Sequence, residues 1–161
     1  MDTLWAPWRM AYVGGHPEPG CLFCRVLAEP GRDVENLVLW RDPGALVMLN
    51  KYPYNSGHLM VAPVRHTGEF TDLSPEEMAA VTSALQKATA LLTRVMAPDG
   101  FNLGANLGRP AGAGIPDHIH FHAVPRWNGD TSFMPVLGST KVIGEHLEAT
   151  LAKLREAIAA G

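Results

Sequence analysis

Hydrophobic residues recur along one long segment of the chain with the period of a helix. From Met78 onward, the apolar positions alternate between steps of three and four residues, which places them on one helix face. They are Met78, Val81, Leu85, Ala88, Leu92 and Val95. Ser74 suits the N-cap position, and Glu77 completes a capping box around Pro75 at the first helical position. The pattern therefore predicts a helix that begins after Ser74 and ends at residues 98–100, whose sequence is Pro-Asp-Gly.

Two further patterns complete the predicted secondary structure. An amphipathic segment over residues 142–159 predicts a second helix, with an inner face formed by Ile143, Leu147, Leu151, Leu154 and Ile158. Short apolar runs bounded by Gly, Pro or Asn predict strands at residues 36–41, Ala45–Leu49, 58–62, 100–106 and 118–124. A series of strands with one long helix inserted and another appended favours the α+β class.

The size and composition of the chain indicate one folded domain. With 161 residues, 47% of them apolar and 18% charged, it can bury a full hydrophobic core. We expect a single domain over residues 1–161, in which residues 1–20, rich in Trp, Pro and Gly, form an irregular N-terminal arm. No apolar stretch approaches the roughly 20 residues of a membrane span, and the N-terminus lacks the basic start and apolar run of a signal peptide. These features predict a cytoplasmic protein without a membrane partner.

The distribution of charge argues against one class of partner. The formal net charge is −3 at pH 7, and the basic residues are scattered along the chain. A protein that follows a nucleic-acid backbone needs a stripe of Lys and Arg side chains. We therefore expect no nucleic-acid partner.

Three of the seven histidines stand at alternate positions of one short apolar run. Because strand side chains alternate between two faces, His118, His120 and His122 would share one face, roughly 6–7 Å apart, while the residues between them point into the core. Such a row is costly, since protonated imidazoles repel and buried neutral ones need partners. The glycine-rich loop at residues 107–117 comes directly before it, and its backbone N–H groups can approach phosphate oxygens. Imidazole is a competent nucleophile toward phosphorus, so the combination predicts phosphate chemistry.

The two cysteines, Cys21 and Cys24, form a Cys-x-x-Cys pair. In a reducing compartment this spacing indicates a metal site or a redox pair more than a structural disulfide. A closed tetrahedral zinc site needs two more ligands, which the pair itself does not supply. No thioredoxin-like pattern surrounds the pair, which favours the metal.

The histidine run HIHFHAV resembles the signature of the histidine triad (HIT) superfamily. The resemblance extends over nearly the whole chain, through LWAPWR, CLFC, LNKYPYNSGHLMVAPVRH and the glycine-rich loop. PRWNGDTSFM, after the triad, is similar to the bacterial branch related to diadenosine tetraphosphate phosphorylases. The resemblance implies a HIT-like fold, with an antiparallel sheet of about five strands, one long inserted helix and a C-terminal helix.

The resemblance also implies roles for individual residues of the triad. The middle histidine of HIT proteins is the nucleophile, so His120 would become a nucleotidyl-histidine, and His122 would hold phosphate oxygens in the transition state. His120 must then be neutral at the attacking nitrogen, and a backbone carbonyl that accepts from its other nitrogen would select that tautomer. The positions that match nucleotide-binding residues are Asn50 at the ribose, Leu46 and Leu49 at the base, His58 beside the site, and Asn106, Gly112 and Gly114 at the phosphates. The alternatives are a turn residue at position 50 and a backbone-bonded histidine at position 58.

The same resemblance implies a metal site and an oligomer. Metal-bearing HIT proteins bind the ion through the Cys-x-x-Cys pair, the histidine of a Pro-x-x-His element and the first triad histidine. In this chain those residues are Cys21, Cys24, His66 and His118. We expect a structural Zn²⁺ that connects the N-terminal segment to the strand of His120. HIT relatives dimerise through their helix and sheet edge, so a homodimer or higher homo-oligomer is implied.

Three functions are compatible with these features. The first is an enzyme that cleaves dinucleoside polyphosphates such as diadenosine tetraphosphate through a His120 adduct, with inorganic phosphate as acceptor and ATP and ADP as products. The second is a hydrolase or phosphoramidase on adenosine monophosphate conjugates, with water as acceptor. The third is a nucleotide-binding regulatory protein. His122 stands where some phosphorylases of the superfamily have Gln, so the triad leaves the acceptor open, and only RWNGDTSFM favours phosphate.

Overall fold

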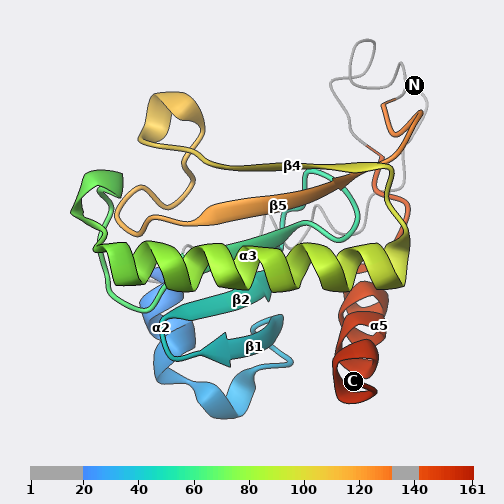
Figure 1. The fold of residues 1–161 in the computed structure, drawn as a ribbon, viewed down its shortest axis with the longest axis horizontal. Coiled ribbons are helices and arrows are strands. Elements are labelled where there is room, and N and C mark those ends of the chain that lie inside the picture. The colour runs from blue at the N-terminus through green and yellow to red at the C-terminus, as the bar shows by residue number, and fades with distance from the viewer. Residues whose placement is uncertain (1–19, 132–141) are drawn as a thin grey trace, which may run out of the picture.

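The protein is described by a computed structural model over residues 20–131 and 142–161. Within these residues, five strands form one antiparallel sheet in the order β1-β2-β3-β5-β4 (Figure 1). The strands are β1 Val38–Asp42, β2 Ala45–Leu49, β3 Leu59–Pro63, β4 Gly100–Ala105 and β5 Phe121–Arg126. The helices are α2 Leu22–Ala28, α3 Pro75–Met96 and α5 Leu147–Ala159, with short 3-10 helices η1 Pro30–Arg32, η2 Phe70–Asp72 and η3 Arg109–Ala111. The predicted α+β fold is confirmed, whereas residues 1–19 of the predicted arm lie outside the described residues.

The long helix α3 begins where the capping signals predict. The Ser74 hydroxyl oxygen accepts a hydrogen bond from the backbone N–H of Glu77 at 3.2 Å, and the Glu77 carboxylate accepts from the backbone N–H of Ser74 at 2.8 Å. The helix ends at Met96, and its C-cap residue Ala97 adopts a left-handed conformation at φ 45°. Local signals are sufficient here because each cap is satisfied within one turn of the chain.

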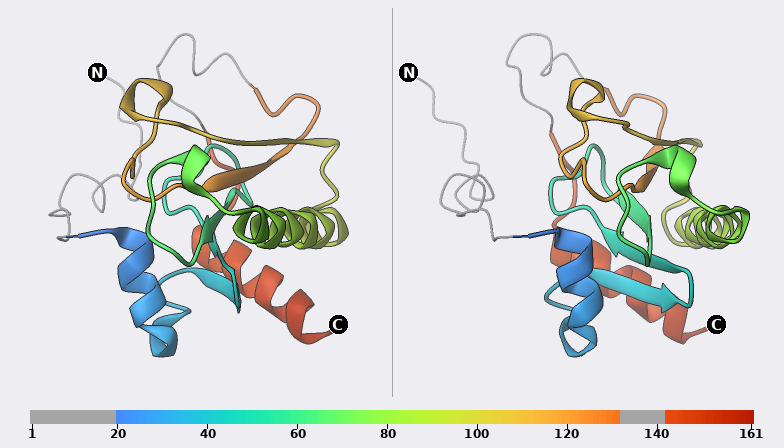
Figure 2. Two further views of the ribbon diagram at one scale, coloured as in Figure 1. Left: turned by 60° about the vertical axis from the view of Figure 1, so that its left-hand side comes forward. Right: turned by 90° about the vertical axis from the view of Figure 1, so that its left-hand side faces the viewer.

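Two helices cover opposite faces of the sheet (Figure 2). The core beneath α3 contains apolar residues of α3 and of alternate strand positions, among them Val47, Leu49, Leu59, Val61, Val81, Leu92, Ile119, Phe121 and Ala123. The core beneath α2 contains Phe23, Val26, Val38, Leu46, Met48, Met60 and Ala62. The central strands β2 and β3 are buried at every position, because each face has its own core. The alternation predicted around the histidines is therefore present, with Ile119, Phe121 and Ala123 in the core under α3.

Strand β5 begins later than the histidine pattern predicts. Its ladder starts at Phe121, so that His118 and His120 lie before the strand and His122 within it. The reason is that the backbone N–H of Ile119 donates to the carbonyl of Thr67 at 2.7 Å, which takes this segment away from β3. Strand β1 also starts later, at Val38, because Leu37 has a positive φ of 60° that is incompatible with a strand.

The C-terminal helix is shorter than its hydrophobic pattern predicts. It begins at Leu147 instead of residue 142, and Ile158 is 38% exposed, so its predicted place on the inner face is wrong. Leu151 and Leu154 do pack into the core beneath α3. Arg155 and Arg94 attach the helix through main-chain carbonyls, those of Val38 and Ala157 respectively, both at 2.8 Å. Across the described ranges, no helix is both long and apolar enough to cross a membrane.

Candidate active site

The segment that leads into β5 holds His120 in one defined tautomer. Its Nδ1 atom lies 2.9 Å from the carbonyl oxygen of His118. A carbonyl oxygen can only accept, so Nδ1 carries the proton and Nε2 has a free lone pair. The side chain is 6% exposed, and burial lowers the pKa of His120 despite the opposing effect of the carbonyl. At neutral pH His120 is therefore an uncharged imidazole with a basic Nε2.

His122 has the opposite orientation, because a chain of hydrogen bonds sets its proton. The backbone N–H of Tyr54 donates to His58 Nδ1 at 3.0 Å, so the proton of neutral His58 is on Nε2. That Nε2 lies 2.9 Å from Nδ1 of His122 and donates to it. The remaining proton of His122 is then on Nε2, which is buried and has no hydrogen-bond partner among the described residues. His122 therefore presents an unused N–H donor.

Burial keeps both histidines of this chain of hydrogen bonds uncharged. Desolvation, followed by the electrostatic effects of His122 and His120, lowers the pKa of His58 to about 3. Desolvation and then His120 lower the pKa of His122 to about 4. The ring centroids of His120 and His122 are 5.0 Å apart and nearly perpendicular. A nitrogen lone pair and an N–H donor thus stand on neighbouring rings, an arrangement that suits attack on a phosphorus whose oxygens need a donor.

The glycine-rich loop is connected to the histidines through Tyr54. The ring of Tyr54 lies 4.5 Å from that of His58 and 5.5 Å from that of His122, between centroids. Its hydroxyl accepts a hydrogen bond from Asn106 Nδ2 at 3.4 Å, and the same nitrogen is 3.5 Å from the carbonyl oxygen of Gly112. Gly112 has φ 94°, a conformation that favours glycine. Asn106 and Gly112 are thus connected through Tyr54 to the histidines, whereas Gly114 lies two residues further along the loop without a part in these bonds.

The other predicted nucleotide-binding residues are distributed over both faces of the sheet. Asn50 follows β2 and its Nδ2 lies 3.4 Å from His58 Nδ1, so it joins the histidine side. Leu49 is fully buried in the core beneath α3, on the opposite face of β2. Leu46 lies on the α2 side but is also fully buried. Because β2 is covered on both faces, both leucines are core residues here, and their predicted contact with a base stays a prediction.

Two contributing residues have no signal in the histidine pattern. Phe23, in α2, packs its ring 5.1 Å from His118 and 5.0 Å from His120 and excludes water from this side. Tyr54 supplies the backbone N–H that sets the tautomer of His58, a role for which any residue except proline would suffice in sequence. Its position four residues before His58 is the one local clue, because that spacing allows the loop to turn back.

The two cysteines meet two histidines beside the triad. The ligand atoms of Cys21, Cys24, His66 and His118 all lie within 4.8 Å of one another. Nδ1 of His118 is 3.3 Å from Cys21 Sγ and 3.3 Å from His66 Nδ1, and Cys24 Sγ is 3.2 Å from His66 Nδ1. In a tetrahedral zinc site with bonds of about 2.0–2.3 Å, ligand atoms lie roughly 3.3–3.8 Å apart. The spacing fits a metal ion that is bound by all four residues.

The tautomer of His118 also suits a metal ligand. Its Nε2 atom donates to the carbonyl oxygen of Pro63 at 2.9 Å, which leaves a lone pair on Nδ1 facing the cysteines. Burial lowers the pKa of His118, so the ring is neutral and available as a ligand. His118 therefore contributes its ring to the cysteine cluster and its carbonyl to His120. The four residues could hold a metal ion, as the sequence predicts.

The HIT domain family model matches residues 32–129, which include the predicted nucleotide site and the triad. The chain belongs to the HIT family. The AP-4-A phosphorylase of Mycobacterium tuberculosis (strain ATCC 25618 / H37Rv) is 39% identical over 159 residues, covering 93% of this chain and 80% of that protein. The adenosine 5'-monophosphoramidase hnt1 of Schizosaccharomyces pombe is 30% identical over 108 residues, covering 67% of this chain and 75% of that protein.

Solved structures of HIT proteins have the same fold. A Zn-bound histidine triad family protein from Mycobacterium smegmatis is 29% identical with a TM-score of 0.70, covering 88% of this chain and 94% of that one. A hypothetical histidine triad nucleotide-binding protein from Sulfolobus tokodaii is 28% identical with a TM-score of 0.68, covering 87% of this chain and 93% of that one. The predicted membership of the HIT superfamily is confirmed, and nucleotide chemistry is the activity that these relatives support.

Proposed function

We propose that this HIT protein cleaves dinucleoside polyphosphates at the α-phosphorus through a covalent adduct on His120. Nε2 of His120 forms a bond to the phosphorus, and the bond from that phosphorus to the bridging oxygen breaks, releasing the rest of the polyphosphate. Nδ1–H stays on the ring, where the His118 carbonyl accepts its hydrogen bond and stabilises the positive charge that the imidazole gains. The observation that carries the proposal is the pair of opposite tautomers, with a lone pair on His120 and a buried, unused donor on His122.

The second step depends on which acceptor attacks the adduct. With inorganic phosphate, a phosphate oxygen bonds to the phosphorus and His120 leaves, so diadenosine tetraphosphate gives ATP in the first step and ADP in the second. The relative named AP-4-A phosphorylase supports phosphate as acceptor. With water as acceptor the second product is AMP, and the relative named adenosine 5'-monophosphoramidase supports this second candidate.

One product analysis tests both candidates. Diadenosine tetraphosphate is incubated with and without inorganic phosphate, and the nucleotides are separated. ADP that forms only with phosphate supports the phosphorylase, while AMP formed at a rate indifferent to phosphate assigns the hydrolytic activity. His120→Ala must abolish the adduct and turnover, whereas His146→Ala, at an exposed histidine next to α5, must leave both unchanged. Wild-type turnover in His120→Ala would exclude the proposed nucleophile.

The nucleotide contacts follow from the residues that surround the triad. We place the ribose near Asn50, beside His58, and the phosphates between the two triad rings and the loop segment that includes Asn106 and Gly112–Gly114. The unused N–H of His122 is the donor for a phosphoryl oxygen. A buried donor without a partner costs about 1–3 kcal/mol, so a bound phosphate would remove that cost.

We also propose that the cysteine cluster binds zinc. A set of two cysteine sulfurs and two imidazole nitrogens is the ligand type that zinc prefers in structural sites. The Zn-bound relative of known structure supports this choice of metal. When bound, the ion supplies a rigid crosslink between α2 and the segment of His118, and it takes no part in the chemistry at His120.

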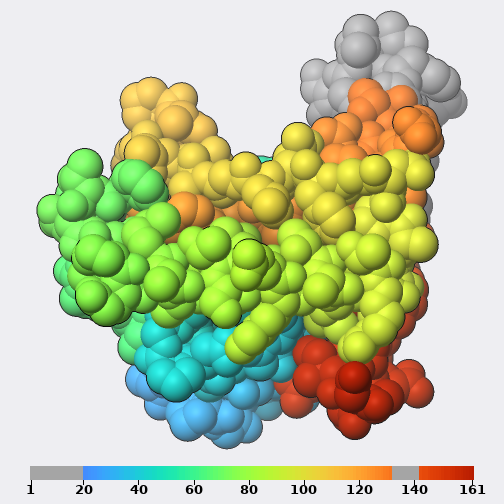
Figure 3. All heavy atoms as spheres, viewed as in Figure 1, coloured from blue at the N-terminus to red at the C-terminus, as the bar shows by residue number. Residues whose placement is uncertain are grey.

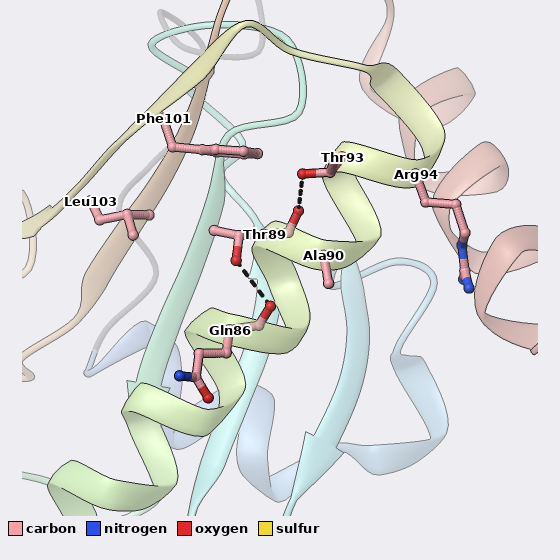
Figure 4. Close-up of a pocket in the computed structure, with 7 residues that line it drawn as sticks. All are labelled: Gln86, Thr89, Ala90, Thr93, Arg94, Phe101 and Leu103. Carbon is pink, nitrogen blue, oxygen red and sulfur yellow. Dashed lines mark hydrogen bonds between the residues drawn. The ribbon is translucent and has the colours of Figure 1, made fainter.

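The sheet edge supports a homodimer as the oligomeric state. β4 is the last strand of the sheet, and Leu103 at its centre is 54% exposed. Phe101 and Leu103 border a groove of about 700 Å³ against α3 (Figure 4), on the face across which α3 runs in Figure 3. An exposed edge strand with apolar residues is a surface for pairing with a second copy. Light scattering should give a dimer mass for the wild type and a monomer mass for Leu103→Lys, with Val142→Lys as the exposed control.

A further inference from the structure

A buried polar contact lies outside the histidine site and joins two distant loops. Asn55, in the loop between β2 and β3, is 6% exposed. Its Nδ2 atom donates to the carboxylate of Asp130 at 2.9 Å and to the carbonyl oxygen of Pro125 at 3.0 Å. Both amide hydrogens are therefore used, in a place where an unpaired amide would be costly. Asp130 belongs to the Arg-Trp-Asn-Gly-Asp turn that follows β5, which the histidine chemistry does not involve.

Asp130 is itself fixed to the sheet. Its carboxylate, 7% exposed, accepts from Arg126 Nε at 2.6 Å and from Arg126 Nη2 at 2.8 Å, and also from the backbone N–H of Trp127 at 3.2 Å. Arg126 continues to Asn102 Oδ1 on β4 at 2.7 Å. The guanidinium holds the pKa of the Asp130 carboxyl well below its usual range, so the group is charged at neutral pH. The Asp130 carboxylate, itself held by Arg126, is thus a charged acceptor that fixes the position of the Asn55 amide.

The loop that this contact holds is the one that sets the protons of the histidines. Asn55 is the neighbour of Tyr54, whose backbone N–H donates to His58 Nδ1 at 3.0 Å. The carbonyl oxygen of Asn55 in turn accepts from the backbone N–H of His58 at 3.2 Å. Two consecutive residues of the loop therefore bond the ring and the backbone of the same histidine. A displacement of this loop would remove the closer donor from His58 Nδ1 and leave only the longer contact with Asn50 Nδ2 at 3.4 Å. The preference for a proton on Nε2 of His58, and one ring further on Nε2 of His122, would then be weakened.

We infer that Asn55 and Asp130 are a positioning pair, which holds the Tyr54–Asn55 backbone so that His58 and His122 keep the tautomers needed to present an N–H to the phosphate. The inference rests on the proposed function for its effect on turnover. A stabilising role alone does not account for the geometry, because the pair connects the turn after β5 with the one loop that contacts His58 Nδ1. The ion pair between Arg126 and Asp130 would exist without Asn55, and it contributes little to stability at a partly exposed site.

The test compares Asn55→Ala, Asp130→Ala and the double variant with Thr131→Ala. Thr131 donates to the other oxygen of the same carboxylate at 3.0 Å, so Thr131→Ala changes the surroundings of Asp130 without touching Asn55. Nitrogen-15 NMR of histidine-labelled, ligand-free protein reports which ring nitrogen carries the proton. The wild type and Thr131→Ala should show His58 and His122 protonated at Nε2 only. Asn55→Ala and Asp130→Ala should show mixed tautomers at both histidines, with kcat lowered at least about tenfold and KM changed by less than about threefold.

The double variant and the spectra decide the remaining outcomes. If the two residues act as one unit, the double variant loses no more activity than the worse single variant, because the second change removes nothing further. Losses that simply multiply, or a folded Asn55→Ala with wild-type spectra and kcat, would overturn the inference. If Asn55→Ala fails to fold while Thr131→Ala folds, the contact is a structural one and the inference is equally overturned. The spectra need no substrate, so they test the pair even if the wild type cleaves none of the proposed dinucleotides.

Discussion

His58 donates from Nε2 to Nδ1 of His122 across 2.9 Å, although the two residues are 64 positions apart in the sequence. This bond leaves His122 with an N–H at Nε2 that no other described group uses. The structure therefore provides a donor that can serve an oxygen of a bound phosphate.

The donor on His122 predicts a graded response to substitution. His122→Gln keeps an N–H near the position of Nε2, whereas His122→Ala removes it. Loss of one donor to a developing oxyanion typically lowers kcat by about 10²–10³-fold, so we expect a loss of that size in His122→Ala and a clearly smaller one in His122→Gln. Steady-state kinetics with diadenosine tetraphosphate measures both. Equal losses in the two variants would contradict the role of His122 as a donor.

The buried neutral histidines predict that stability falls as the pH is lowered below about 6.5. The pKa of His58 is lowered to about 3 and that of His122 to about 4, while both ionise near 6.5 in the unfolded chain. Between these values the unfolded state binds more protons than the folded state, so the free energy of unfolding decreases as the pH falls. The slope is at most about 1.4 kcal/mol per pH unit for each histidine.

Denaturant titrations between pH 7.5 and 5 measure this slope above the range in which carboxylates titrate. His58→Asn removes one of the two groups and should give a shallower dependence than the wild type. His146→Ala, at an exposed position, is the control and should retain the wild-type slope. A pH-independent free energy of unfolding over this window would show that the rings are not kept neutral.

The position of Gly57, next to His58, predicts that its substitution lowers the stability of the protein. It has φ 75°, and a Cβ at this position would lie 2.6 Å from Sδ of Met96 and 3.2 Å from Cδ2 of Leu92. Gly57→Ala therefore combines backbone strain with a displaced α3 side chain, and should destabilise the protein by about 1–3 kcal/mol. Gly31→Ala is the control, because a Cβ there meets nothing within 4 Å and no positive φ is involved. Urea denaturation of the two variants measures the difference in stability. Equal midpoints in Gly57→Ala and Gly31→Ala would contradict the prediction.

The cysteine cluster predicts that loss of one of its cysteines affects stability more than turnover. Cys21→Ser should lose most of the bound zinc and melt several degrees lower, because one ligand of the proposed crosslink is gone. Turnover per folded molecule should decrease less than the metal content, since His120 lies outside the cluster. Metal analysis, melting curves and activity on the same preparations test this, with chelator-treated wild type as a second arm. Unchanged melting and no metal in either form would exclude the zinc proposal.

Local patterns were sufficient where the determining contacts are close in sequence. The capping box of Ser74 and Glu77 is present as predicted, because both partners lie within one turn. The alternation of the histidines with core residues is also correct, since it follows from strand geometry alone. The predicted start of β5 was wrong because the backbone N–H of Ile119 donates a hydrogen bond to the carbonyl of Thr67. Nothing near Ile119 in the sequence identifies that partner.

Contacts between distant residues needed either a family resemblance or the structure. Cys21 and His118 are 97 positions apart, and their approach was predicted through the resemblance to HIT proteins. Asn55 and Asp130 are 75 positions apart, and neither residue type indicates such a partner. The position of Leu49 shows a related limit of sequence-based prediction. A strand that is buried on both faces is apolar throughout, so its sequence does not show which core each side chain enters.

His118 takes part in two centres, with its ring facing the cysteines and its carbonyl oxygen holding the proton of His120. A displacement of the segment that carries the cysteines would consequently alter the reactivity of Nε2 of His120, although this segment does not contact that nitrogen. Engineers who wish to remove the thiols from this protein, for instance to make it tolerant of oxidants, must therefore supply another support for the peptide group at position 118.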